Sequence, residues 1–176
     1  MSWRVGELKN NETVKIKVGF GFDTHKLTEG RDLMLGGVSI PHEKGALGHS
    51  DADVLIHAII DALLGAAGLP DIGFQFPDSD PQYKNVDSKI LLRKTLEMIC
   101  TRGFAIGNID TTIVLQRPKI QTFIPVMQHT LSQILNLSAD QLTVKAKTSE
   151  NLGFIGREEG ISAYATVLLE KTTDGR

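Results

Sequence analysis

The chain has 176 residues, of which 41% are hydrophobic, and its formal net charge is −2 at pH 7. The length predicts a single domain, and the near-neutral charge argues against a nucleic-acid or membrane-surface partner. No apolar run in the sequence is long enough to span a bilayer, so we expect no membrane partner.

Cys100 is the single cysteine, so the chain cannot form an internal disulfide or a zinc site made of several thiolates. Any bound metal must therefore use histidine and carboxylate ligands. The absence of disulfide pairs favours a reducing, intracellular compartment. Cys100 closes an apolar helical pattern, and we expect it to fill the core rather than to act as a reactive thiol.

The chain begins with a polar stretch. Residues 1–13 are expected to form a disordered extension, and residues 14–172 a single domain. Val14–Phe20 alternates apolar residues with lysines, which predicts a strand. Leu33–Ile40 carries a glycine pair between apolar residues, which predicts a β-hairpin.

A long helix is predicted at Ser50–Ala67, because apolar residues recur there at helical spacing. Ser50 and Asp53 match a capping-box pattern at its start, and a glycine and a proline end it. The next segment, Asp71–Asn85, is rich in Asp, Pro and Gly and is expected to be a long ordered loop. Loops of this length in compact domains are often functional.

The second half of the chain alternates helices and strands. The predicted helices are Ser88–Thr101 and an amphipathic helix within Pro118–Leu137 that Pro125 interrupts early, and the predicted strands are Ile106–Leu115, Leu142–Lys147 and Ile161–Leu169. This alternation places the chain in the α+β (α/β) class as a single domain.

Asp23 and His25 are two residues apart, so in an extended segment both side chains lie on one face. His57 lies within the predicted helix. Two imidazoles and one carboxylate form a typical catalytic zinc shell with an open fourth position. If these three side chains converge, they form a divalent metal site. The alternative for His57 is a hydrogen-bonded core residue.

Two aspartates lie one helical turn on either side of His57. Asp53 and Asp61 could orient the imidazole of His57 through hydrogen bonds. The alternatives are that Asp53 caps the helix and that Asp61 lies on a solvated face.

His49 and Ser50 fall at the predicted helix N-terminus, where backbone N–H groups and the helix dipole favour phosphate. The alternative for Ser50 is helix capping. Asp71–Gly73 and Phe76–Pro81 carry carboxylates that could bind sugar hydroxyls, as acidic residues bind ribose. Composition alone favours turn chemistry for both segments, because Asp beside Pro is a common turn pair.

Three later segments offer cations, hydroxyls and glycines. Arg117–Lys119 follows one predicted strand, and Lys147–Glu150 follows another with two hydroxyls and a carboxylate. Gly153–Gly160 is glycine-rich but matches neither a Walker nor a Rossmann fingerprint. Together with a metal and a helix N-terminus, these groups suit a polyphosphate ligand.

Several stretches taken together carry a family resemblance. They are Gly19–His25, Leu35–Val38, Gly48–Asp53, His57–Ala58, Asp61–Ala67, Asp71–Gly73, Phe76–Asp80, Pro118–Lys119, Lys147–Glu150 and Gly153–Arg157, in order within Ile16–Lys171. The chain resembles the 2-C-methyl-D-erythritol 2,4-cyclodiphosphate synthase family of the non-mevalonate isoprenoid pathway. The resemblance implies a mixed β-sheet with helices packed on one face, assembling as a homotrimer with active sites between subunits.

The resemblance also implies a set of metal ligands. Asp23, His25 and His57 would bind a zinc-type ion. Glu150 would bind a second ion, Mg²⁺ or Mn²⁺, together with the substrate diphosphate.

Further site residues follow from the same resemblance. His49 and Thr148 would stabilise the transition state. The substrate-binding residues would be Asp23, His25, His49, Ser50, Asp71, Ile72, Gly73, Phe76, Asp78, Asp80, Leu115, Lys119, Ile120, Gln121, Lys147, Thr148, Ser149, Glu150, Phe154 and Arg157. Phe154 and Arg157 would face a central cavity of the trimer that binds isoprenoid diphosphates.

The implied activity converts 4-diphosphocytidyl-2-C-methyl-D-erythritol 2-phosphate into 2-C-methyl-D-erythritol 2,4-cyclodiphosphate and CMP, a phosphorus–oxygen lyase reaction. One alternative is a metal-dependent phosphohydrolase that uses the same ligands to activate water. Another is a non-catalytic isoprenoid-diphosphate binding protein. A bacterial cytoplasmic location is expected over a plastid, because the N-terminus is short and not rich in arginine.

Overall fold

The computed structural model describes residues 16–172. The expected extension 1–13 and the first two residues of the predicted strand Val14–Phe20 lie outside that range. The strands are β1 (Ile16–Glu29), β2 (Leu33–Leu35), β3 (Val38–Ile40), β4 (Lys44–Leu47), β5 (Phe104–Val114), β6 (Leu142–Lys147) and β7 (Gly160–Lys171). The helices are α1 (Val54–Ala67), α2 (Ile72–Gln75), α3 (Ser88–Thr101), α4 (Ile124–Leu135) and α5 (Gly153–Gly156), with 3-10 turns η1 (Pro81–Tyr83), η2 (Gln121–Phe123) and η3 (Ala139–Gln141).

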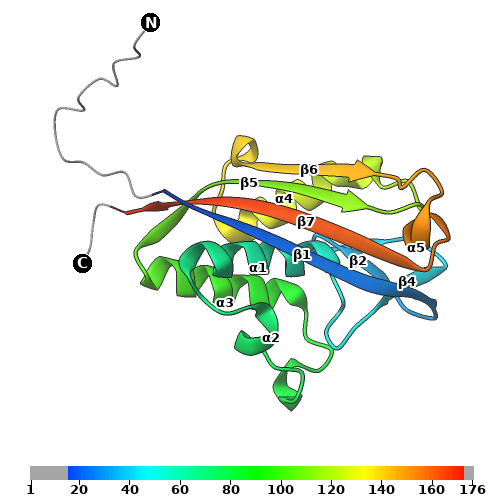
Figure 1. Cartoon of the computed structure of the whole chain (residues 1–176), viewed down its shortest axis with the longest axis horizontal. Helices are drawn as coiled ribbons and strands as arrows, with labels where there is room; N and C mark the ends of the chain where they lie inside the picture. Colours follow the sequence, from blue (N-terminus) through cyan, green and yellow to red (C-terminus); the bar gives the residue numbers. More distant parts are fainter. Residues whose placement is uncertain (1–15, 173–176) are drawn as a thin grey trace, which may run out of the picture.

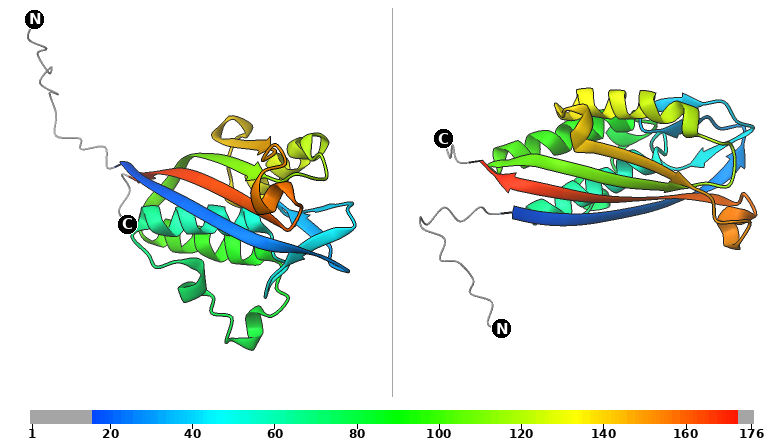
Figure 2. Two further views of the ribbon diagram at one scale, coloured as in Figure 1. Left: turned by 45° about the vertical axis from the view of Figure 1, so that its right-hand side comes forward. Right: turned by 90° about the horizontal axis from the view of Figure 1, so that it is seen from above.

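Five strands form a mixed sheet in the order β4-β1-β7-β5-β6, in which β5 and β6 are parallel and the other neighbours antiparallel. Strands β2 and β3 form the predicted hairpin, with Gly36 and Gly37 at positive φ in its turn. Helices α1, α3 and α4 lie on one face of the sheet (Figures 1 and 2). The predicted single α+β domain with a mixed sheet is confirmed.

Strand β1 presents its two faces to different surroundings, because successive side chains alternate. Gly19, Gly21 and Leu27 are buried, and Asp23 and His25 between them are half-buried. The alternate positions Ile16, Val18, Phe20 and Phe22 are exposed, and Phe20 retains 65% of its accessible surface. The alternation predicted a strand correctly, but its apolar side chains turn away from the helices.

Strand β1 approaches helix α1 closely at two glycines. A Cβ atom on Gly21 would lie 1.9 Å from the carbonyl oxygen of Ala58, and one on Gly19 would lie 1.9 Å from that of Ala62. These are backbone atoms, which cannot move aside as a side chain can. The missing side chains therefore allow the close contact that brings His57 of α1 beside Asp23 of β1.

Helix α1 begins at Val54, four residues after the predicted start. Asp53 is its N-cap, and its carboxylate accepts hydrogen bonds from the N–H of Ile56 and from those of the two hairpin glycines, at 3.1, 2.9 and 2.6 Å. Burial raises the pKa of the Asp53 carboxyl group, although these N–H groups oppose the shift. The predicted capping box with Ser50 is wrong, because Asp53 caps the helix alone and anchors the hairpin turn to it.

Most other predicted elements are found with small changes of boundary. Helix α3 and strand β6 match their predicted ranges, while β5 and β7 each begin slightly earlier. The predicted loop Asp71–Asn85 contains α2 and η1. Pro125 lies in the first turn of α4, where its missing N–H has no helical partner to lose, so it starts the helix rather than interrupting it.

Cys100 is exposed, so the expectation that it fills the core is wrong. Its neighbour Ile99 is fully buried, and a one-residue step along a helix turns the side chain by about 100°. No helix within the described residues combines the length and apolar character needed to cross a bilayer.

Candidate metal centre

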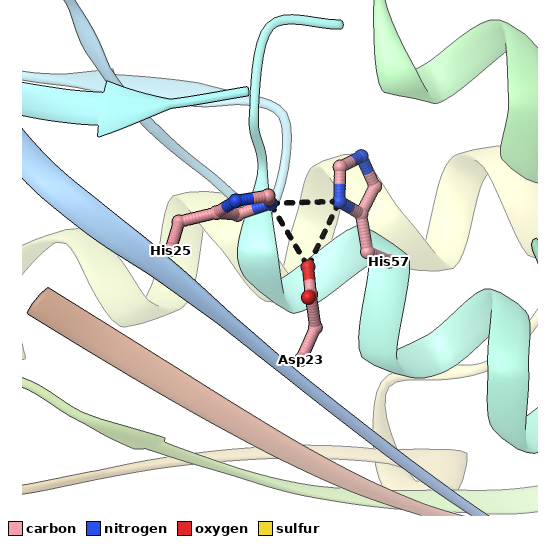
Figure 3. A group of neighbouring side chains, drawn as sticks. All are labelled: Asp23, His25 and His57. Carbon is pink, nitrogen blue, oxygen red and sulfur yellow. Dashed lines mark hydrogen bonds and ion pairs between the residues drawn. The ribbon is translucent and has the colours of Figure 1, made fainter. Parts of the chain in front are cut away.

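The three predicted ligands converge between β1 and α1 (Figure 3). The Oδ2 atom of Asp23 lies 3.0 Å from Nε2 of His25 and 2.9 Å from Nδ1 of His57. The two imidazole nitrogens are 3.1 Å apart. Three lone-pair atoms at this separation repel one another unless a proton or a cation lies among them.

The electrostatics of the cluster favour a positive charge at its centre. Burial raises the pKa of the Asp23 carboxyl group, but hydrogen bonds and charge from His25 and His57 outweigh burial and hold that pKa well below its usual range. Burial lowers the pKa of the His57 imidazole, but the hydrogen bond and charge of Asp23 outweigh it and raise that pKa. Two imidazole nitrogens and one carboxylate oxygen are also a common ligand set for zinc, so these residues fit a divalent metal ion.

The two aspartates that flank His57 in sequence do not orient it. Asp53 caps α1, as the alternative interpretation held, and the carboxylate of Asp61 accepts a hydrogen bond from the N–H of Ile72 at 2.8 Å. Asp61 therefore ties the start of α2 to α1 rather than lying free on a solvated face. Two serine hydroxyls lie beside His57 instead: the Oγ atoms of Ser88 and Ser50 are 3.0 and 3.1 Å from its Nε2 atom. Ser88 was predicted only as the start of a helix.

His49 and Ser50 do not form the N-terminus of α1, so their predicted placement there is wrong, while their binding of phosphate stays a prediction. His49 and Ser50 precede the first residue of α1 by several positions, and the capping place holds the carboxylate of Asp53. The N-terminal N–H group of Ile56 is thus already paired with Asp53.

A cavity of about 270 Å³ opens beside the metal cluster. Of the predicted site residues, it brings together Asp23, His25, His49, Ser50, His57, Ile72, Gly73, Phe76 and Asp78. Gly48, Tyr83, Val86 and Leu91 also line it and were not among the predicted site residues. These residues come from segments that are far apart in the sequence, so the cavity forms only when those segments pack together.

His49 offers an available ligand group in this cavity. Its Nε2 atom is buried and has no hydrogen-bond partner among residues 16–172. Buried polar nitrogens are nearly always paired in folded proteins, so this atom is suited to bind a polar group of a ligand.

A second cavity of about 230 Å³ lies at the carboxyl ends of β5 and β6. It brings together the predicted residues Leu115, Lys119, Ile120, Gln121, Lys147 and Thr148. The parallel pairing of β5 with β6 explains this, because the segments that follow both strands emerge at the same edge. Ligand sites of α/β sheets commonly lie at such carboxyl ends. The two cavities share no lining residue.

Six predicted residues line neither of these cavities. They are Asp71, Asp80, Ser149, Glu150, Phe154 and Arg157. The first two act as N-caps of α2 and η1, which is the turn chemistry that composition favoured. The Arg157 guanidinium pairs with the carboxylate of Glu159 at 2.9 Å.

Glu150 is held close to the second cavity. Its carboxylate accepts a hydrogen bond from the hydroxyl of Thr148, which lines that cavity. Glu150 and Asn151 both have positive φ, at 52° and 64°. Non-glycine residues with positive φ are uncommon and often occur at functional sites.

Fold and site together define a single-domain α/β protein with a two-histidine, one-carboxylate centre beside a cavity. The chain belongs to the YgbB family, whose model matches residues 16–170. It is 63% identical over 158 residues to a 2-C-methyl-D-erythritol 2,4-cyclodiphosphate synthase of Bacteroides fragilis, over 90% of this chain and 99% of that protein. The resemblance found in the sequence is thus confirmed.

Solved structures show the same fold. The chain is similar to IspF of Plasmodium falciparum in a CDP complex, with a TM-score of 0.79 and 37% identity over 90% of this chain and 97% of that one. It is also similar to part of the bifunctional IspDF from Campylobacter jejuni, with a TM-score of 0.87 and 43% identity. That match covers 90% of this chain and 43% of the bifunctional one.

Proposed function

We propose that this protein converts 4-diphosphocytidyl-2-C-methyl-D-erythritol 2-phosphate into 2-C-methyl-D-erythritol 2,4-cyclodiphosphate and CMP, as a phosphorus–oxygen lyase of non-mevalonate isoprenoid biosynthesis. The observation that carries the proposal is the convergence of Asp23, His25 and His57 at a cavity. The 63% identity to a synthase of that name supports it over almost the full length of the relative.

The proposed reaction is an internal phosphoryl transfer. An oxygen of the 2-phosphate forms a bond to the β-phosphorus, and the bond from that phosphorus to the bridging oxygen breaks, so the electron pair leaves with CMP. The attacking oxygen is already anionic, so no side-chain base is required. The protein must overcome repulsion between anions and hold the substrate in a folded conformation.

The proposed metal roles follow from the resemblance to the synthase family. Asp23, His25 and His57 would hold a zinc-type ion, and Glu150 would hold Mg²⁺ or Mn²⁺ at the substrate diphosphate. When bound, such ions neutralise phosphate charge and polarise phosphoryl oxygens. Glu150 is well placed for this role because it lies beside Thr148 at the rim of the second cavity.

The remaining residues would position the substrate. The free Nε2 of His49 and the hydroxyl of Thr148 would donate to oxygens that gain charge, and loss of one such donor typically costs about 2.7–4 kcal/mol. Ser50, Ile72, Gly73, Phe76 and Asp78, with Asp71 and Asp80 nearby, would bind the methylerythritol and ribose portions. The second cavity, with Leu115, Lys119, Ile120, Gln121, Lys147 and Ser149, would bind the cytidine diphosphate side.

A homotrimer would complete this site. His49 and Thr148 line different cavities of one chain. One substrate molecule would contact both residues where the two cavities come from neighbouring subunits. The apolar residues on the open face of β1, joined by Tyr164 of β7 at 5.1 Å from the ring of Phe22, would bury their exposed surface against the other copies. Phe154 and Arg157 would then face the central cavity and an isoprenoid diphosphate. The bacterial cytoplasm is the compartment that fits this activity.

Phosphorus NMR tests the proposed function directly. We expect the purified protein, incubated with its proposed substrate, zinc and magnesium, to produce the cyclic diphosphate and an equimolar amount of CMP. A linear phosphate product would instead identify the phosphohydrolase. Binding without CMP release, by protein of confirmed fold and metal content, would indicate the non-catalytic isoprenoid-diphosphate binding protein.

Glu150→Gln should separate the two metal roles. The exchange removes the negative charge but keeps the size of the side chain and an acceptor for Thr148. We expect the magnesium concentration for half-maximal activity to rise by roughly tenfold or more, which corresponds to about 1.4 kcal/mol, with zinc content unchanged. A magnesium titration of CMP release measures this. The control is Glu97→Gln, at an exposed position of α3. An unchanged magnesium response of Glu150→Gln would remove Glu150 from the site.

A further inference from the structure

We propose that Ser88, held in place by Asp51, is a positioning residue that orients the His57 imidazole for metal binding. The inference rests on the proposed metal role of His57. It adds two residues, Ser88 and Asp51, that have no part in the proposed function. Ser88 is the first residue of α3 and is fully buried, although its side chain is polar. Its hydroxyl lies where α1, α3 and the segment before α1 meet.

The single hydroxyl hydrogen of Ser88 determines which of its neighbours it can donate to. The Ser88 hydroxyl donates to Oδ1 of Asp51, and the Ser88 backbone N–H donates to Oδ2 of the same carboxylate at 3.1 Å. A hydroxyl has one hydrogen, and here the carboxylate takes it. Toward Nε2 of His57, at 3.0 Å, the Ser88 oxygen can therefore only accept.

This arrangement selects one tautomer of His57. An accepting oxygen at Nε2 requires the proton to be on Nε2, which leaves the lone pair of Nδ1 free. Nδ1 is the nitrogen that faces Asp23 and His25, and it must be unprotonated to bind a metal ion. The competing tautomer, with its proton on Nδ1 and directed at Asp23, would block the site. Ser88 opposes that tautomer.

Asp51 is itself fixed by the backbone. Its N–H donates to the carbonyl of Val86 at 3.1 Å, and the N–H of Asn85 donates to the carbonyl of His49 at 2.8 Å. These two bonds attach the segment before α1 to the segment before α3. The carboxylate of Asp51 is thereby held within hydrogen-bonding distance of Ser88. Because this acceptor is charged, its hydrogen bond is stronger than one to a neutral acceptor.

Ser50 has a different part in the cluster. Its Oγ lies 3.1 Å from Nε2 of His57 and 3.4 Å from Oγ of Ser88, and it accepts a hydrogen bond from the N–H of Ala52. No carboxylate takes its hydrogen among the described contacts, and it lines the cavity. The hydrogen of the Ser50 hydroxyl can thus be donated to a ligand in the cavity, whereas the hydrogen of the Ser88 hydroxyl is taken by Asp51.

The test is the zinc affinity of Ser88→Ala, measured on the full-length apo protein by competition with a chromophoric chelator. Loss of a residue that supports a metal-bound histidine typically weakens metal binding by about 10–100-fold, and we expect a loss in that range. The cobalt-substituted protein should also show a shifted visible absorption band, because the imidazole is no longer held in one orientation. A purely structural role of Ser88 would lower the unfolding midpoint and leave both readouts unchanged.

Two further variants complete the design. Thr95→Val removes another buried hydroxyl of α3, which donates to the carbonyl of Leu91 at 3.0 Å, and should leave zinc affinity within about twofold of the wild type. Asp51→Asn keeps an acceptor for Ser88 but removes the charge, so a smaller loss of affinity is expected; it also serves if Ser88→Ala fails to fold. Wild-type zinc affinity in both Ser88→Ala and Asp51→Asn overturns the inference. Failure of the wild type itself to bind zinc overturns the metal site and the inference together.

Discussion

Replacing His57 by alanine is expected to abolish stoichiometric zinc binding and to lower turnover by on the order of 10²–10³-fold or more. The two remaining ligands, Asp23 and His25, come from a single strand, and α1 would no longer close the site. The fold should persist, because His57 lies at the edge of the cavity and its removal enlarges that cavity instead of leaving a sealed void. Metal analysis, CMP release and circular dichroism measure the three outcomes.

His129→Ala is the matched control. His129 is an exposed histidine on α4, remote in sequence from the cluster and outside both cavities. We expect it to keep wild-type zinc content and turnover. Wild-type turnover by His57→Ala in metal-free buffer would falsify the assignment of His57 as a metal ligand.

Gly21→Ala should strongly destabilise the fold. The new Cβ would lie 1.9 Å from the carbonyl oxygen of Ala58 and 2.6 Å from the backbone nitrogen of Ala62. Both contacts are with the α1 backbone, so the helix itself must move away from β1. Overpacking usually costs about 1–3 kcal/mol where side chains can adjust. Here we expect at least about 3 kcal/mol, or loss of folded protein.

Gly65→Ala provides the comparison on the same helix. Gly65 is exposed in α1, and apart from the backbone of α1 itself, a Cβ there would meet no atom of residues 16–172 within 4 Å. Alanine favours a helix interior over glycine by about 1 kcal/mol, so this variant should be as stable as the wild type or slightly more stable. Urea unfolding of the apo proteins compares the two variants. Equal midpoints for Gly21→Ala and the wild type would show that β1 and α1 do not depend on this close contact.

A folded Gly21→Ala protein would be informative as well. Any displacement of α1 carries His57 away from Asp23, which lies two residues beyond Gly21 on the same face of β1. We therefore expect its zinc affinity to fall even if it folds. The stability of the domain and the geometry of the metal site depend on the same glycine contact.

Local patterns in the sequence were sufficient for most of the fold. Alternation of apolar and polar residues identified the N-terminal part of the first strand, and the glycine pair identified the hairpin. Helix α3 and strand β6 agree with their predicted bounds because each has a clear start and stop. The errors were also local: the helix start was assigned to Ser50 because both Ser50 and Asp53 are good caps, and Cys100 was placed inside because it follows Ile99 in an apolar helical pattern.

Residue types and their spacing supply the chemistry available to this protein: Asp23 and His25 on one strand face, a histidine in an apolar helix, and the polar segments that follow the strands. Which of these groups meet depends on packing between segments that are far apart in the sequence. His57 reaches Asp23 across 34 positions because two glycines let β1 approach α1. Ser88 reaches His57 across 31 positions because α3 packs beside α1. Periodicity reports the surroundings of one segment, whereas contacts between segments depend on how closely their backbones can approach.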